Sequence, residues 1–543
     1  MKRLFLTSFL ILTLSPSFYA LFSQGRVYPS ELFSRAEKTQ FEETTLSYEV
    51  RNFVNTLSEL SDDVTVEVFG QSLSGQDLQL VIMADPRITT PEEAKASGKP
   101  IIYIQGNIHA GEVEGKEAIM TLMREIAFEE KHYLLDNQII LFCPNYNPDG
   151  NDKLADNNRG SQDGSPLLAG ERASGEGFDL NREGLKLEAL EAKALVKNVF
   201  GRWDPALFVD LHTDNGSWHG YAVNFAPSFH SAGQIEPTTF TKENIFPWIQ
   251  TDILNRSGIQ TWWHGYYRNR AGQTPVYSGY SHQPRYMTNY VGLRNRMGIL
   301  SESFAHQLFE LRYEATYRLI ESILRYTNDH AEEVVKLIAD ADKETIETIK
   351  QQAGKLQKGV RYKLTDKAEV VSILARETVA KEDKNGRRRT RGTGKIYWQD
   401  SVKHFNSFVP TMLSTVPKAY YFSKDFSAIA DKLKEHGIEV EQLDTRIKMG
   451  GEQFLVQKYK KNSRSRYPGH NPVTLEGIFE PAQKTFKAGD YKVSLEQPLA
   501  WLIFYLLEPQ SDDGLVFWNF FDEYLEKSDV SKKKVFFPIA KEF

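Results

Sequence analysis

Apolar and polar positions along the first 330 residues form two alternating kinds of stretch. Short, almost continuous apolar runs at 101–105, 138–143 and 206–211 predict buried strands. Longer stretches, such as 114–130, 185–200 and 308–329, predict helices. Strands that alternate with helices are typical of an α/β domain, which we place at about residues 25–330.

The pattern changes after the charged stretch at 331–357, which we predict to be a helical connector. Residues 358–543 contain many short strand-like runs and few helical patterns, of which 428–436 is the clearest. We predict a smaller, mainly β accessory domain here. Within it, the aromatic run at 516–521 is expected to belong to a sheet, the basic stretch at 384–395 to an exposed hairpin loop, and Asp512-Asp513-Gly514 to a plain turn.

The first 20 residues have the pattern of a secretory signal peptide. Lys2 and Arg3 precede an apolar run at 4–14, and a small-residue cleavage site follows at Ala20. The apolar run is too short to span a bilayer as a mature helix, so no stable membrane insertion is expected after cleavage. We therefore predict an exported protein, periplasmic or extracellular; the alternative is an ordinary buried first helix.

Composition narrows the functional classes. The net charge of −6 gives no reason to expect a nucleic-acid partner. Cys143 is the single cysteine, which excludes a disulfide within the chain, and its apolar context predicts a small buried side chain. Nothing in the sequence indicates the oligomeric state.

Polar side chains with metal-binding chemistry follow the predicted strands. His109 and Glu112 come just after the strand at 101–105, and His212 follows the strand at 206–211. A catalytic zinc takes three protein ligands of this kind and leaves one position for water. One sheet could bring the three together, so we predict one Zn²⁺ ion bound by His109, Glu112 and His212.

Further residues fit the chemistry that such a metal performs. Metal-activated water needs a base that takes its proton and passes it to the leaving amine, and Glu302, at the end of a short strand at 298–300, suits this role. A carboxylate that accepts a hydrogen bond from a ligating histidine fixes its tautomer; Asp179 and Asp210 compete for that role.

Two arginine-bearing segments fit substrate recognition. An arginine facing the scissile carbonyl would stabilise the developing oxyanion, and Arg172 is the candidate, with Arg159 as the alternative. Asn181 and Arg182 offer a fork for a substrate carboxylate, which arginine can bind with two hydrogen bonds.

In their order and local context these motifs closely resemble the zinc carboxypeptidases of the carboxypeptidase A type, peptidase family M14. The resemblance extends over about residues 45–325 and rests on His109-x-x-Glu112, Asn147-Pro-Asp-Gly150, Arg172…Asp179-x-Asn181-Arg182, His212 and Glu302. It implies a mixed, twisted sheet flanked by helices and a zinc ion bound by the two histidines and Glu112. It also implies Glu302 as general base and acid, Arg172 as polariser of the carbonyl, Asn181 and Arg182 as binders of the terminal carboxylate, and Asp179 as the residue that orients His109.

Some positions depart from the family. His212 is followed by Thr-Asp instead of Ser-Tyr, and the mobile tyrosine that caps the substrate could be Tyr280, with Tyr286 and Tyr290 as rivals. The strand-rich accessory domain lies outside the resemblance and favours a bacterial, secreted member.

Three functions remain open on the sequence alone. The first is a secreted metallocarboxypeptidase that acts on peptides with a free C-terminal carboxylate. The others are a zinc amidase acting on peptidoglycan stem peptides or another amide, and a non-catalytic binding protein on the same scaffold.

Overall fold

The computed structural model describes residues 28–162, 164, 166–214, 216–230, 232–270, 272–382, 388–464, 467–530 and 533–543. The predicted signal peptide at 1–20 lies outside the described residues. In the part of the chain that is described, no helix has the length and apolar character needed to cross a membrane.

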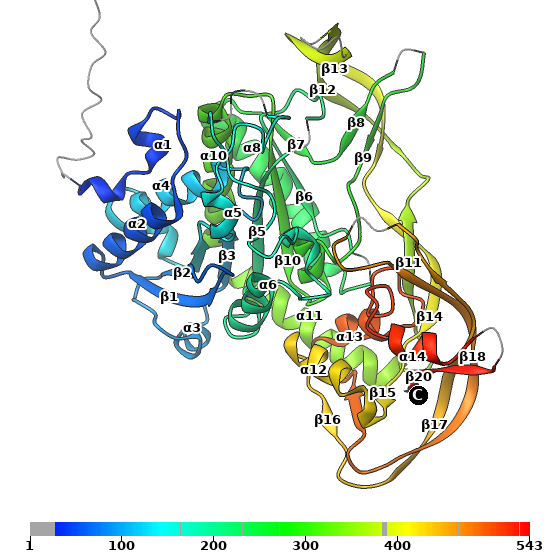
Figure 1. Ribbon diagram of the computed structural model, residues 1–543. Coiled ribbons are helices and arrows are strands. Elements are labelled where there is room, and N and C mark those ends of the chain that lie inside the picture. Colours follow the sequence, from blue (N-terminus) through cyan, green and yellow to red (C-terminus); the bar gives the residue numbers. More distant parts are fainter. Residues whose placement is uncertain are drawn as a thin grey trace, which may run out of the picture.

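A mixed eight-stranded sheet forms the centre of the first part of the molecule, with strand order β1-β2-β4-β3-β5-β10-β6-β7 (Figure 1). Its strands are β1 (Val64–Gln71), β2 (Asp77–Met83), β3 (Ile101–Gln105), β4 (Ile139–Cys143), β5 (Leu207–Thr213), β6 (Val223–Pro227), β7 (Thr261–Trp263) and β10 (Met297–Ser303). The central strands β4, β3, β5 and β10 run parallel, and β6 pairs antiparallel with β10.

Helices cover both faces of this sheet. Ile102 and Ile104 of β3 belong to one buried cluster, whereas Tyr103 between them belongs to another, as the two-residue period of a strand requires. The first cluster is shared with α2 (Ser47–Leu60), α4 (Glu114–Phe128), α8 (Phe246–Ser257) and α10 (Phe309–Asp329). The second is shared with α6 (Leu190–Ala194) and α9 (Met287–Gly292).

Burial on both faces explains why the central strands have continuous apolar sequences. The prediction of a mixed sheet flanked by helices is confirmed, and Cys143 of β4 is buried as expected. Short helices complete this part: α1 (Arg35–Lys38), α3 (Pro91–Ser97), α5 (Pro148–Asp152) and α7 (Glu236–Phe240).

The long helix α11 (Ala331–Gln352) leads into a mainly β C-terminal region, as predicted (Figure 1). Its largest sheet has the order β16-β19-β15-β20-β17-β18, and β11 pairs with β14. The bounds are β11 (Gln357–Leu364), β12 (Glu369–Glu382), β13 (Arg388–Phe405), β14 (Phe408–Thr415), β15 (Ala419–Phe422), β16 (Glu441–Gln442), β17 (Ile447–Lys461), β18 (Val473–Phe486), β19 (Tyr491–Ser494) and β20 (Val535–Glu542), with helices α12 (Ser427–Glu435), α13 (Ala500–Leu507) and α14 (Asp522–Lys527). The predicted domain boundaries at 330 and 358 stay predictions.

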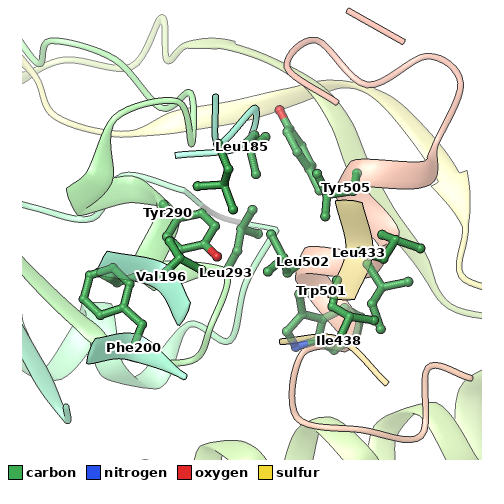
Figure 2. Packing of buried hydrophobic residues seen from close by; sticks show 14 of the residues in the cluster. Leu185, Val196, Phe200, Tyr290, Leu293, Leu433, Ile438, Trp501, Leu502 and Tyr505 are labelled. Carbon is green, nitrogen blue, oxygen red and sulfur yellow. The ribbon is translucent and has the colours of Figure 1, made fainter. Parts of the chain in front are cut away.

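Two features join the C-terminal region to the first part. The hairpin β12–β13 continues into β9 (Val276–Ser278) and β8 (Tyr266–Arg268), so one four-stranded sheet takes strands from both parts. In addition, Leu185, Tyr290 and Leu293 share a single buried cluster with Leu433 and Trp501 of the C-terminal region (Figure 2).

Three local expectations need correction. The helix predicted at 185–200 begins only at Leu190, because the buried Glu183 carboxylate accepts hydrogen bonds from the N–H groups of Glu188 (2.7 Å) and Ala189 (3.0 Å) and holds the preceding segment in an irregular form. The aromatic run at 516–521 forms turns, not strands, because the rings of Phe517 and Trp518 pack around the Arg285 side chain of the first part. The strand predicted at 298–300 extends to Ser303, so Glu302 lies within it.

Candidate active site

Three neighbouring segments of the central sheet bring the predicted metal ligands together. His109 and Glu112 lie in the turn between β3 and α4, where the N–H of Glu112 donates to the carbonyl of His109 (2.8 Å). His212 lies near the end of β5, and Glu302 is its register partner on the parallel strand β10. Strand ends that meet at one sheet edge thus place all four side chains in one region.

The nitrogen and oxygen atoms of the three predicted ligands converge. One ligand atom each from His109, Glu112 and His212 lies within 4.8 Å of the others, and all three residues are buried. The two Glu112 oxygens lie 3.0 Å from His109 Nδ1 and 2.9 Å from His212 Nδ1, and the two Nδ1 atoms are 3.1 Å apart.

The outer nitrogens of both rings face carboxylates. His109 Nε2 lies 3.1 Å from Asp179 Oδ1, and His212 Nε2 lies 3.0 Å from Asp210 Oδ2. The Asp179 carboxylate holds the ring proton of His109 on Nε2, which leaves the Nδ1 lone pair of His109 directed at the other ligands. Asp179 and Asp210 were rival candidates, and each contacts a different histidine.

This donor set fits a zinc ion. Two neutral imidazole nitrogens and one carboxylate are the ligands of several catalytic zinc sites. Burial alone would raise the pKa of Glu112, but His109 and Arg159 beside it hold this pKa well below its usual value. Glu112 is therefore ionised, which suits a cation at the point where the three side chains meet.

A cavity adjoins the cluster and contains the other predicted residues. Its walls include the three predicted ligands with Arg172, Asn181, Arg182 and Glu302. Burial raises the pKa of Glu302 well above its usual value. His212 acts in the opposite direction and lowers this pKa, whereas the nearby Glu112 carboxylate raises it further. The carboxyl group thus faces the cavity in an environment that favours proton exchange.

The two candidate arginines differ in their positions. Arg172 lines the cavity and donates through Nε and Nη2 to Asp179 Oδ2, at 3.0 Å each. Arg159 does not line it; its Nη1 lies 2.9 Å from Glu112 Oε1, and its side chain packs over Gly111. The geometry therefore places Arg172, but not Arg159, in the wall of the cavity.

Tyrosines form much of the remaining wall. Tyr280 and Tyr286 line the cavity, whereas Tyr290 is buried elsewhere, 2.9 Å from His436 Nδ1. Tyr266 also lines the cavity and was not singled out from the sequence.

His264 is a further wall residue without an assigned role in the sequence. Its Nε2 lies 3.6 Å from Glu302 Oε1, and burial lowers the pKa of His264 to about 4. The ring is therefore neutral beside the carboxyl group. No spacing in the sequence connected the two residues, because β8 and its preceding turn bring His264 to the site.

Comparison with known proteins points to one family. The family model for zinc carboxypeptidases matches residues 50–183, which contain His109 and Glu112. The chain is 23% identical over 452 residues to carboxypeptidase 2 of Trichophyton tonsurans, covering 78% of this chain and 74% of the relative. It is 22% identical over 462 residues to carboxypeptidase 2 of Trichophyton rubrum, and this match covers 80% of this chain and 77% of the relative.

These matches support the zinc carboxypeptidase family. The chain is a peptide hydrolase that is similar to the zinc carboxypeptidases. Among solved structures, it is similar to a putative carboxypeptidase A from Shewanella denitrificans, with a TM-score of 0.39 and 20% identity, over 53% of this chain and 69% of the other. The named relatives are fungal, so the bacterial origin expected from the accessory region stays a prediction.

Proposed function

We propose that this chain is an exported, zinc-dependent metallocarboxypeptidase that hydrolyses the C-terminal peptide bond of peptides. The observation that carries the proposal is the convergence of His109, Glu112 and His212 beside a cavity that also holds Glu302. Its substrate would be a peptide with a free C-terminal carboxylate. The pattern of residues 1–20 supports export to the periplasm or the extracellular space.

The site residues divide the reaction between them. His109, Glu112 and His212 would hold zinc, which supplies a Lewis acid and lowers the pKa of a water molecule. Glu302 takes the proton from the attacking water and delivers it to the leaving amine. Arg172 donates hydrogen bonds to the carbonyl oxygen as negative charge develops there.

Substrate orientation depends on the neighbouring segment. Arg182 has its Nη1 bound to the Asn181 carbonyl (2.7 Å), so its guanidinium is held at the cavity wall. Asn181 and Arg182 together bind the terminal carboxylate and place the scissile bond beside Glu302. Asp179 orients His109, and it also holds Arg172.

Glu302→Gln tests the proton-transfer role. We expect kcat for a peptide with a free C-terminus to fall on the order of 10²- to 10⁴-fold, while KM and zinc content stay near those of the unmodified enzyme. The control is Glu310→Gln, an exposed glutamate at the start of α10, which should leave kcat unchanged. Undiminished turnover in Glu302→Gln would remove this residue from the mechanism.

The choice of substrate needs a separate assay. The zinc-loaded enzyme is incubated with a peptide acid, the corresponding C-terminal amide and muropeptides, and the products are identified by mass spectrometry. A metallocarboxypeptidase releases the last residue from the peptide acid and acts poorly on the amide. Cleavage of muropeptides alone would favour the amidase, and no cleavage of any substrate would favour a binding protein.

A further inference from the structure

The carboxylate-binding pair Asn181–Arg182 is held by one loop, residues 284–287. The N–H of Met287 donates to Asn181 Oδ1 (3.1 Å), and the Arg182 guanidinium lies 4.1 Å from the centre of the Tyr286 ring. The carbonyl of Arg285 accepts a hydrogen bond from the N–H of Gly184 (3.0 Å). The position of this loop therefore fixes where Asn181 and Arg182 can meet a substrate.

The Arg285 side chain anchors the loop in the C-terminal region. It is 2% exposed, and its Nη2 lies 2.7 Å from Asp513 Oδ1. The backbone N–H of Arg285 donates to the other oxygen of Asp513 (2.8 Å). The guanidinium carbon also lies 4.8 Å from the ring centre of Phe517 and 4.9 Å from that of Trp518, close enough for cation–π attraction.

The segment after Arg182 is held from the same side. Lys432 Nζ donates to the Leu187 carbonyl (3.0 Å), and His436 Nε2 lies 3.1 Å from the Leu185 carbonyl. His470 Nε2 lies 2.7 Å from Glu188 Oε2. Leu185 itself packs in the buried cluster shared with the C-terminal region (Figure 2).

We propose that the C-terminal region positions the carboxylate-binding site, with Arg285 as the positioning residue that connects Asp513 to Asn181 and Arg182. This inference rests on the proposed carboxypeptidase function. Arg285 does not line the cavity, so its effect on a substrate passes through the loop. A buried guanidinium requires its partners, because an unpaired buried charge is costly. Asp513, the hydroxyl group of Tyr467 and the surrounding aromatic rings therefore determine where the loop lies.

The arrangement assigns a role to the C-terminal region. It positions the residues that would select a free C-terminus, although these residues, the predicted metal ligands and Glu302 all come from the first part of the chain. Disrupting the contacts between the C-terminal region and the loop 284–287 should weaken recognition of the carboxylate more than it weakens zinc binding.

The test measures binding, not turnover. Full-length, zinc-loaded Glu302→Gln protein is titrated by calorimetry with a short peptide acid and with its C-terminal amide. The dissociation constant of the amide divided by that of the acid reports how strongly the carboxylate is recognised. Adding Asp513→Asn should reduce this ratio on the order of tenfold, because a small misplacement of a binding group has a large cost. Zinc affinity, from competition with a chelator, should stay unchanged.

A matched control separates positioning from general destabilisation. Glu508 forms a similarly buried pair with Lys541 (2.7 Å) inside the C-terminal region, so Glu508→Gln in the same background should lower the melting temperature without changing the ratio. If Asp513→Asn does not fold, the double replacement Arg285→Met/Asp513→Asn removes both partners, which is often tolerated. We expect the double variant to show the same reduced ratio of dissociation constants.

The outcomes distinguish the two proposals. If the parent protein prefers the acid and Asp513→Asn keeps the same ratio, the positioning inference is wrong and the proposed function stands. If the parent binds acid and amide equally, carboxylate recognition by this site is wrong, and both proposals fail.

Discussion

Buried carboxylates determine much of the chemistry at the scale of single residues. Asp179 directs His109 toward Glu112, whereas Asp210 lies beside His212, and the sequence alone could not tell the two carboxylates apart. Similar burial acts differently on Glu191 of α6. Its two carboxylate oxygens find no hydrogen-bond partner among the described residues, and burial raises the pKa of Glu191 to about 7.

Glu191→Gln should therefore change how stability depends on pH. At pH 4.5 the carboxyl is almost fully protonated in the folded protein and about half protonated in the unfolded protein, so its effect on stability is small. As pH rises toward 7 the unfolded chain ionises first, and the folded state loses stability, by up to about 3 kcal/mol above pH 7. We expect Glu191→Gln to be more stable than the unmodified protein at pH 8 and nearly equal to it at pH 4.5.

Denaturant unfolding of the zinc-saturated protein at the two pH values measures this difference. Glu59→Gln, an exposed position on α2, serves as the control and should show no pH-dependent gain. A gain of the same size at both pH values would show that Glu191 does not carry the raised pKa.

At the scale of elements, the close contact of α4 with β5 sets the distance between Glu112 and His212. Gly115, in the first turn of α4, allows this contact, since a Cβ atom there would lie 2.7 Å from Leu211 Cβ. Leu211 precedes His212, so the packing of the helix determines the geometry of the metal ligands.

Gly115→Ala tests the contact. Replacing glycine by alanine inside a helix normally stabilises by about 1 kcal/mol, but the clash should reverse the sign and destabilise by about 1–3 kcal/mol. Zinc affinity should fall at the same time, as measured by chelator competition. Gly160→Ala, where nothing lies within 4 Å of the added atom, is the control. A stabilised Gly115→Ala protein with normal zinc affinity would contradict this interpretation.

The sequence predicted those elements whose pattern is local. Continuous apolar runs identified β3, β4 and β5, and the polar residues after them identified His109, Glu112 and His212. The sequence did not predict the features that depend on contacts between residues far apart in the chain. Glu183 delays the start of α6, the rings at 516–521 pack around Arg285, and His264 reaches Glu302 through the turn before β8. No local pattern records such pairings.

At the scale of the whole molecule, the two parts share one buried cluster. Trp501, Leu502 and Leu433 pack with Leu185 and Tyr290 (Figure 2). In addition, β13 pairs with β9 of the first part. The contacts resemble the inside of a domain more than an interface between independent units.

We expect the two parts to unfold together. Heating should give one transition, with the same midpoint by far-UV circular dichroism and by release of zinc, because exposing the shared cluster costs both parts their stability. Leu502→Ala should lower both midpoints equally, with about 2–5 kcal/mol lost. Zinc retained after the C-terminal region has melted would show that the parts are independent.

The shared cluster also determines the order of events during synthesis. Leu185 and Tyr290 leave the ribosome about three hundred and two hundred residues, respectively, before α13 (Ala500–Leu507), whose side chains belong to the same buried cluster. Until then, the nascent chain cannot close its core beside Asn181 and Arg182. A ribosome must therefore translate α13 before the segment that contains Asn181 and Arg182 can take its final shape.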